Sequence, residues 1–203
     1  MLLLIALFIS LVAASVARAG EITGSVQGVR DLENVVVYVE HAEGTFKPPA
    51  EGAVMDQHNV QFVPHVLPIL SGTDVKFPNS DTVRHNVFSP TKVKKFNLGI
   101  YPPGVTKVVL MDIPGAQVVS LLCAIHAQLA AFIVVVQNPH FAMADKDGHF
   151  TISGVPPGAY DVVAWHEKQP QLPKEKVVVG AAPAKVSLTF ATDYGRTGER
   201  SGQ

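Results

Sequence analysis

Short apolar runs separated by turn residues dominate this chain and constrain its fold more than any other feature. The runs are rich in valine and lie at residues 35–39, 60–63, 73–77, 105–111, 118–122, 132–136, 177–179 and 185–190. No stretch shows the sustained 3.6-residue apolar period of a capped amphipathic helix. Because glycine and proline punctuate the runs, the pattern predicts an all-β protein of β-sandwich architecture.

The two ends of the chain differ from this pattern. Residues 1–16 are almost unbroken apolar and lead into Ala17-Arg18-Ala19, an A-x-A cleavage signature. We expect a signal peptide at 1–19, cleaved after Ala19, and a periplasmic or secreted protein without membrane attachment. An uncleaved anchor is the alternative, because the run approaches the length of a membrane span. The Gly-rich, polar segment 191–203 is expected to be a flexible tail.

The charge balance excludes some partners. The chain has 16 Lys and Arg against 17 Asp and Glu, and it lacks the basic stripe that would indicate binding to nucleic acid or to an anionic membrane. It also lacks a nucleophile elbow, an acid pair and a phosphate loop, so we do not expect an enzyme. We expect a monomer.

The strongest chemical signal is a cysteine with two histidines. Cys123 is the single cysteine and stands in Cys123-Ala124-Ile125-His126, downstream of His85. One thiolate and two imidazoles from separated strand-like segments are the equatorial ligands of a trigonal blue-copper site. A lone thiol in an exported protein needs burial, a partner or a metal. The residues therefore predict one copper ion bound by His85, Cys123 and His126.

Each of these residues also has an ordinary structural interpretation. Cysteine is among the most buried residue types, so Cys123 could be a core side chain, and His85 could be a strand histidine bonded to backbone. The other histidines lie apart in the sequence and are not expected to bind metal: His41, His58, His65, His140, His149 and His166.

Residues 53–137 contain an ordered series of motifs. They are Gly72-Thr73, Phe77-Pro78-Asn79, His85-Asn86, Pro114-Gly115 and the Cys-x-x-His that begins at Cys123. In this order they resemble a small cupredoxin of the amicyanin, pseudoazurin and plastocyanin group, of the type often labelled methylamine-utilisation proteins. The resemblance implies a Greek-key β-sandwich and a type 1 copper bound by the three residues named above. It also implies that Asn86, without ligating, ties the two ligand segments together.

One position departs from that family. Where short-loop relatives place an axial Met three residues after the second His, this chain has Leu129, which cannot ligate. The copper would be three-coordinate or would take an axial group from Met55, Asp56 or Gln57. Without a thioether donor the reduction potential should rise. Decay of the site is the other interpretation, although all three equatorial ligands are retained.

The flanking segments resemble two parts of a second module. Residues 145–165, with turns at Asp147-Gly148 and Pro156-Pro157-Gly158, look like part of a carboxypeptidase regulatory-like, transthyretin-like β-sandwich of Ig-like type. Its first two strands are matched by 21–26 and 34–39.

We therefore expect the cupredoxin to be inserted in this module, whose two parts would be 20–49 and 138–190. Residues 169–176, with prolines, lysines and glutamate, are expected to form a solvent loop.

Three functions fit this sequence. The first is an exported copper protein that carries single electrons between redox partner proteins by Cu(II)/Cu(I) cycling. The second is a copper carrier or sensor that retains Cu(I), which a three-coordinate site would suit. The third is a metal-free interaction or carbohydrate-binding module.

Overall fold

The computed structural model describes residues 19–191, so the predicted signal peptide and the predicted tail lie almost entirely outside the described residues. Regular structure in the described part is nearly all β, which confirms the fold class. Within residues 19–191 no helix is long and apolar enough to span a membrane. The elements are β1 Gly20–Gln27, η1 Leu32–Asn34, β2 Val36–Val39, β3 Ala53–Val54, β4 Asp56–His58, β5 Gln61–Val63, β6 Val66–Leu70, β7 Thr73–Pro78, β8 His85–Ser89, η2 Lys92–Lys94, β9 Phe96–Tyr101, β10 Thr106–Met111, β11 Gln117–Leu122, β12 Ala130–Val136, β13 Phe141–Met143, β14 His149–Val155, β15 Gly158–Trp165, β16 Lys174–Val179 and β17 Ala184–Thr189.

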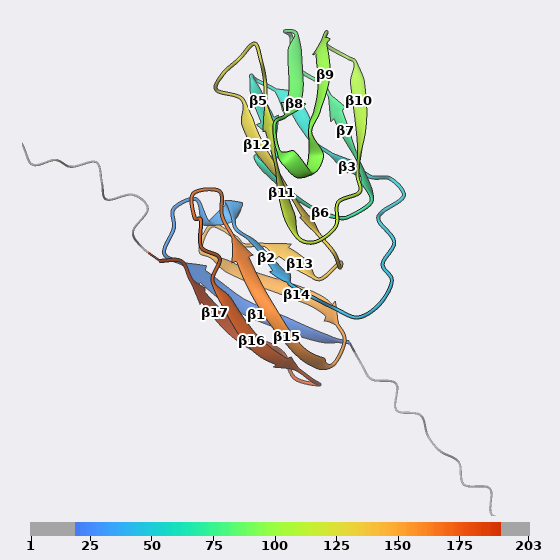
Figure 1. Cartoon of the computed structure of the whole chain (residues 1–203). Coiled ribbons are helices and arrows are strands. Elements are labelled where there is room, and N and C mark those ends of the chain that lie inside the picture. The colour runs from blue at the N-terminus through green and yellow to red at the C-terminus, as the bar shows by residue number, and fades with distance from the viewer. Residues whose placement is uncertain (1–18, 192–203) are drawn as a thin grey trace, which may run out of the picture.

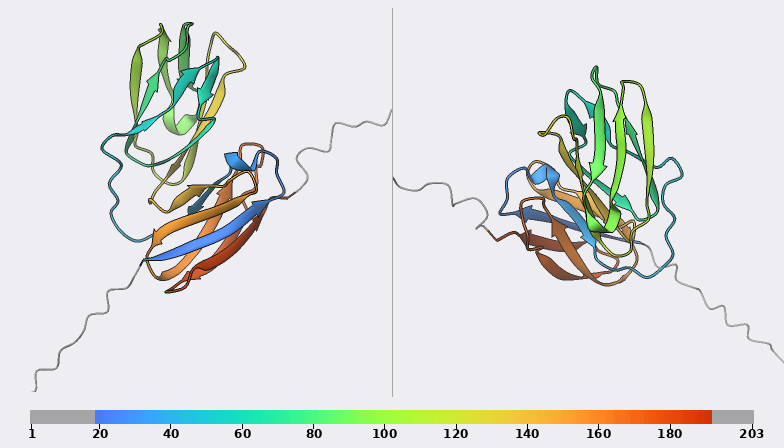
Figure 2. Two further views of the ribbon diagram at one scale, coloured as in Figure 1. Left: turned by 180° about the vertical axis from the view of Figure 1, so that it is seen from behind. Right: turned by 45° about the horizontal axis from the view of Figure 1, so that its top comes forward.

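The strands form two sandwiches, one above the other in Figure 1. The central sandwich contains β3 to β12 and packs the sheet β10-β7-β3 against the sheet β6-β12-β11-β8-β9, with the hairpin β4-β5 beside them. The terminal sandwich contains β1, β2 and β13 to β17 and packs β14-β1-β17 against β13-β2-β15-β16. The left view in Figure 2 also shows the two sandwiches one above the other.

Strands from both ends of the described chain pair in the terminal sandwich. Ile22 of β1 lies opposite Ile152 of the antiparallel β14 and beside Ala184 of the parallel β17. Strand β2 pairs with β15 and β13. The chain leaves this sandwich after β2 and returns at β13, where Asn138 Nδ2 donates to Val39 O at 2.8 Å. The interpretation of this path as a cupredoxin inserted into a transthyretin-like module stays a prediction.

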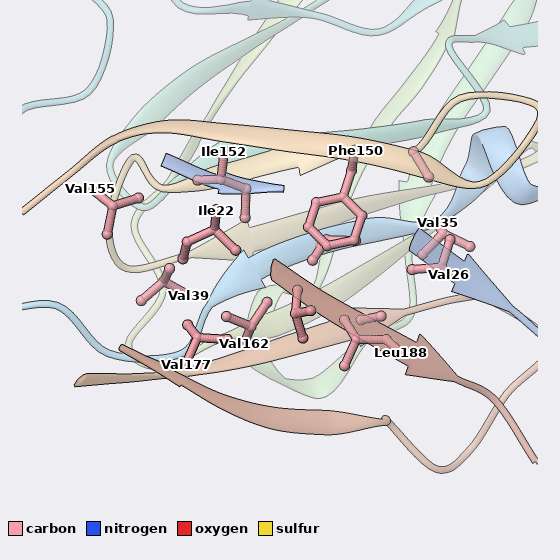
Figure 3. Close-up of a cluster of buried hydrophobic side chains, with 14 of the residues drawn as sticks. Ile22, Val26, Val35, Val39, Phe150, Ile152, Val155, Val162, Val177 and Leu188 are labelled. Carbon is pink, nitrogen blue, oxygen red and sulfur yellow. The ribbon is translucent and has the colours of Figure 1, made fainter. Parts of the chain in front are cut away.

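The core of the terminal sandwich is apolar. Aliphatic side chains and Phe150 from its two sheets meet in the layer shown in Figure 3. The chain turns at Asp147-Gly148, as predicted. The hydrogen bond from Gly148 N–H to Asp145 O, at 3.0 Å, closes this turn. Gly148 has φ 85°, and a Cβ at this position would meet the carbonyl oxygen of Val26, so glycine is required there.

Strand β12 accounts for the longest unbroken apolar run of the central sandwich. Its alternate residues Ala131, Ile133 and Val135 face the core of the central sandwich. The residues between them face the terminal sandwich, so both faces of the strand are buried and the usual alternation of polar and apolar residues disappears. The cluster on this second face, here called the interface cluster, contains Val36, Tyr38, Val66, Val134, Val136, Val163 and Trp165, with Phe132 packed against it.

The prediction of a solvent loop at 169–176 is wrong for its last three residues. Strand β16 begins at Lys174, and residues 174–176 pair with residues 161–163 of β15. Strand β16 is the edge strand of its sheet, and charged side chains are common on such edges. The polar composition of this segment therefore marks an edge strand.

Candidate metal centre

The three predicted metal ligands come together at one end of the central sandwich. His85 is the first residue of β8, Cys123 directly follows β11, and His126 lies in the loop between β11 and β12. Strands β8 and β11 are neighbours in one sheet, with Leu122 opposite Phe88. This pairing brings the two ligand segments side by side, and one donor atom from each of the three residues lies within 4.8 Å of the others.

The donor atoms converge on one point. Nδ1 of His126 lies 3.2 Å from Nδ1 of His85 and 3.9 Å from Sγ of Cys123. Metal–imidazole bonds are about 2.0 Å and metal–thiolate bonds about 2.3 Å for a small tetrahedral ion, so one ion can span each of these two pairs, and the atoms of the third pair lie within 4.8 Å of each other. His85 is fully buried and Cys123 is 5 % exposed, whereas His126 is half-buried. The donor set fits copper.

An aspartate orients His85. Nε2 of His85 lies 3.0 Å from Oδ2 of Asp81, and this oxygen also accepts the N–H of Val60. The Val60 hydrogen bond, followed by the one with His85, lowers the pKa of Asp81 to about 2. The carboxylate is therefore ionised and only accepts, so Nε2 carries the hydrogen and Nδ1 presents its lone pair to the donor cluster.

The contact of Asp81 with His85 was not predicted from the sequence. The available signal was an acidic residue four positions before the first histidine ligand, in the turn that follows β7. Such a residue is common at turns for other reasons, because aspartate caps its own backbone there. Asp81 does so too, since its Oδ1 accepts the N–H of Thr82 at 2.7 Å.

Asn86 links the two ligand segments. Its Oδ1 accepts the N–H of Ala124 at 3.2 Å, and its Nδ2 donates to Asn97 Oδ1 and to Gly99 O. The amide is 2 % exposed. These hydrogen bonds hold the strand of His85 against the loop of Cys123, which is the contact that the cupredoxin resemblance implies for this residue.

Leu129 and two of the three candidates for an axial group, Met55 and Gln57, are buried. Leu129 is 1 % exposed and Met55 is fully buried, and both lie in the same core as Cys123. Gln57 is also fully buried, and within the described residues its Oε1 has no hydrogen-bond partner. Its Nε2 donates to Pro78 O at 2.8 Å and to Tyr101 Oη at 2.6 Å.

Tyr101 accepts a hydrogen bond from the amide of Gln57, and its pKa responds to the charge of Cys123. The pKa of Tyr101 is raised to about 12, mainly by burial. The charge of Cys123 also raises this pKa, and the hydrogen bond with Gln57 lowers it. The phenol is therefore neutral at ordinary pH. Whether Met55, Asp56 or Gln57 provides an axial group stays a prediction.

The exposed edge of the centre is surrounded by apolar side chains. A shallow hollow beside His126 is lined by Thr82, Val83, Arg84, Ile100, Pro103, Ile125 and His126. Ile100 is 53 % exposed and Ile125 is 45 % exposed. Large exposed aliphatic side chains grouped in this way are typical of a surface that contacts another molecule.

The remaining histidines lie outside the cluster of His85, Cys123 and His126. His149 groups with Asp145 and Asp147 on an exposed turn. However, Asp145 Oδ1 already accepts the N–H groups of Asp147 and His149. This geometry is that of an Asx turn.

Comparison with known proteins gives structural similarities only. No family model matches the chain, and no curated protein matches it. Similar solved structures include a purple cupredoxin from Nitrosopumilus maritimus, at 21% identity and TM-score 0.37, covering 41% of this chain and 98% of that one. An amicyanin from Paracoccus versutus has 17% identity and TM-score 0.38 and covers 49% and 96%. A copper-containing nitrite reductase from Thermus scotoductus has 17% identity and TM-score 0.40 and covers 57% and 28%. At these low values the similarities carry no argument about function, which rests on the donor geometry.

Proposed function

We propose that this chain is an exported copper protein that carries single electrons between redox partner proteins. The observation that carries the proposal is the convergence of Cys123 Sγ with the Nδ1 atoms of His85 and His126. One bound copper ion of type 1 would supply the Cu(II)/Cu(I) couple at this point.

The protein's own residues would keep the donors in place. Two of the donors are held by hydrogen bonds outside the ligand set: His85 by Asp81, and the Cys123 loop by Asn86. A donor set held in a rigid sheet changes little when the metal changes its oxidation state, and this lowers the reorganisation that electron transfer requires.

The route for the electron would lead through His126. It is the half-buried ligand, and the apolar hollow surrounds it. A redox partner that covers the hollow would bring its own centre close to this imidazole. In this proposal the chain acts as a monomeric carrier and is not an enzyme.

The test is to add Cu(II) to the purified metal-free protein and to record the visible spectrum. We expect one copper per chain and an intense thiolate-to-copper band toward the red end, because Cys123 would supply a covalent Cu–S bond. Equivalent Zn(II) additions control for nonspecific precipitation and should give no colour. A colourless protein that retains a titratable thiol would refute the proposal.

A second function has one observation in its favour. Leu129 is buried in the same core as Cys123 and cannot ligate, and if no other residue supplies an axial group, three-coordinate ligation would suit retention of Cu(I). A Cu(I) carrier would take up Cu(I) tightly and exchange electrons slowly. A fast electron self-exchange rate in the copper-loaded protein would favour the electron carrier.

A further inference from the structure

His65 connects the two sandwiches beside the candidate metal loop. It directly precedes β6, and its Nδ1 lies 3.1 Å from the carbonyl oxygen of Ala130, the first residue of β12. Its Nε2 lies 2.8 Å from Oε1 of Glu167, which follows β15 in the terminal sandwich. The segment after β15 bends toward β12 in Figure 1.

Both hydrogen bonds require the imidazole to donate. A carbonyl oxygen and an ionised carboxylate accept and cannot donate. A neutral ring donates to one of these two oxygens, and a ring that carries hydrogen on both nitrogens donates to both. Hydrogen bonds between charged groups are shorter and stronger than those between neutral groups. The side chains of His65 and Glu167 are 38% and 17% exposed, so water screens this pair in part.

The carbonyl that His65 holds terminates the ligand loop. Ala130 lies four positions after His126, and within this interval Leu129 N–H donates to His126 O at 3.0 Å. A backbone hydrogen bond thus joins Leu129 to His126 within the loop. The imidazole of His65 contacts the carbonyl oxygen of Ala130 at the end of the loop. The ring of His65 is in turn placed by an edge contact with Phe132, whose centroid is 5.6 Å away.

We propose that His65 and Glu167 together form a clamp that positions the loop of His126, so that the terminal sandwich supports the copper site of the central one. The inference rests on the proposed function and deepens it. His65 acts through the loop and does not bind the metal. The clamp gives the terminal sandwich a role in the metal chemistry although it contributes none of the three donors.

The experiment uses the full chain and compares Glu167→Ala with Glu175→Ala. Glu175 is an exposed glutamate of β16 in the same sandwich, so its variant is the matched control. The Glu167→Gln variant keeps an oxygen that accepts from Nε2 and should behave as an intermediate rescue. The His65→Phe variant removes both hydrogen bonds and keeps an aromatic ring against Phe132.

The first measurement is hydrogen exchange of residues 124–130 in the metal-free protein. The second is the rate at which a chelator removes Cu(II), followed by the thiolate-to-copper band. We expect Glu167→Ala and His65→Phe each to accelerate both processes about tenfold, the lower end of the effect of groups that orient metal ligands. The two changes should not add when combined, because either one opens the clamp.

Three outcomes are informative. Equal exchange and release rates for Glu167→Ala and Glu175→Ala would overturn the clamp. Faster exchange spread evenly over both sandwiches in both clamp variants would overturn it too, because the pair would then only stabilise the fold. If the wild type binds no copper, the proposed function fails, and the exchange of residues 124–130 decides the clamp alone.

Discussion

The two sandwiches bury polar side chains in different ways. In the central sandwich His85 and Asn86 are buried with hydrogen bonds that fix their orientation. In the terminal sandwich the core is apolar, and within the described residues the buried Nε2 atoms of His140 and His166 have no hydrogen-bond partner. Oriented polar groups inside a core are costly unless they are paired. The paired polar groups in the central sandwich surround the candidate metal centre, where Gln57 Oε1 is the unpaired exception among the described residues.

The largest expected effect is the loss of the thiolate-to-copper band by a change in the central sandwich alone. The Cys123→Ser variant should lose the thiolate-to-copper band completely, because no other thiol exists in the chain. The matched change in the other sandwich, His166→Gln, should leave the band unchanged. A visible spectrum of each variant with added Cu(II) checks this. A band that survives in the serine variant would place the thiolate ligand elsewhere and remove the contrast between the sandwiches.

A large effect on stability should follow when the contact between the sandwiches is weakened. Trp165 lies in the interface cluster and is 8% exposed. The Trp165→Ala variant should lower the free energy of unfolding by about 3 kcal/mol or more, measured by denaturant unfolding of the metal-free protein. The control Val178→Ala changes a residue that is 77% exposed and should alter stability by less than about 0.5 kcal/mol. Two separate unfolding transitions in wild type would show that the sandwiches are independent.

A smaller effect concerns the axial side of the central sandwich. The Leu129→Met variant should offer a thioether, stabilise Cu(II) and lower the reduction potential. A shift on the order of 60 mV corresponds to a tenfold change in the preference for Cu(II) in a one-electron couple. Voltammetry of the variant and of the control Leu172→Met checks this. An unchanged potential and spectrum would mean that position 129 does not face the metal.

The smallest effect belongs to the terminal sandwich and its two buried histidines, His140 and His166. Burial lowers the pKa of both His140 and His166 from the ordinary value of 6.5. Because the unfolded chain takes up these protons at higher pH than the folded protein does, stability is full above that value and falls as the pH drops below it. The midpoint of denaturant unfolding should decrease over that range.

The double variant of His140→Gln and His166→Gln should flatten this pH dependence. His149 lies on an exposed turn, so His149→Gln is the control and should keep the wild-type slope. If the double variant keeps the full slope as well, the pH dependence arises in the other sandwich.

The sequence allowed the donors to be predicted because their signal is local. Cys123 and His126 form a short motif, and His85 belongs to the His85-Asn86 pair of the ordered motif series. The strand run at 132–136 was also visible. Its burial on both faces could be seen only with Val134 against the terminal sandwich, because an unbroken apolar run does not say what covers each face.

The supporting contacts could not be predicted in the same way. His65 and Glu167 are separated by 102 positions, and nothing local to either residue indicates the other. Their sequence surroundings fit an ordinary strand histidine and an exposed glutamate. Gln57 and Tyr101 meet across 44 positions and show the same limit. Polar contacts between distant strands depend on register, which a single sequence specifies only weakly.

The sharing of β12 between two cores has a consequence for the geometry of electron exchange. A strand packed on both faces cannot turn relative to either sandwich without exposing apolar surface to water. The contact between the sandwiches therefore has no free hinge at β12. The loop of His126, which leads into β12, keeps a constant orientation relative to the terminal sandwich. Anything bound to the terminal sandwich would hold a fixed distance and direction from the loop of His126, through which the proposed electron route leads.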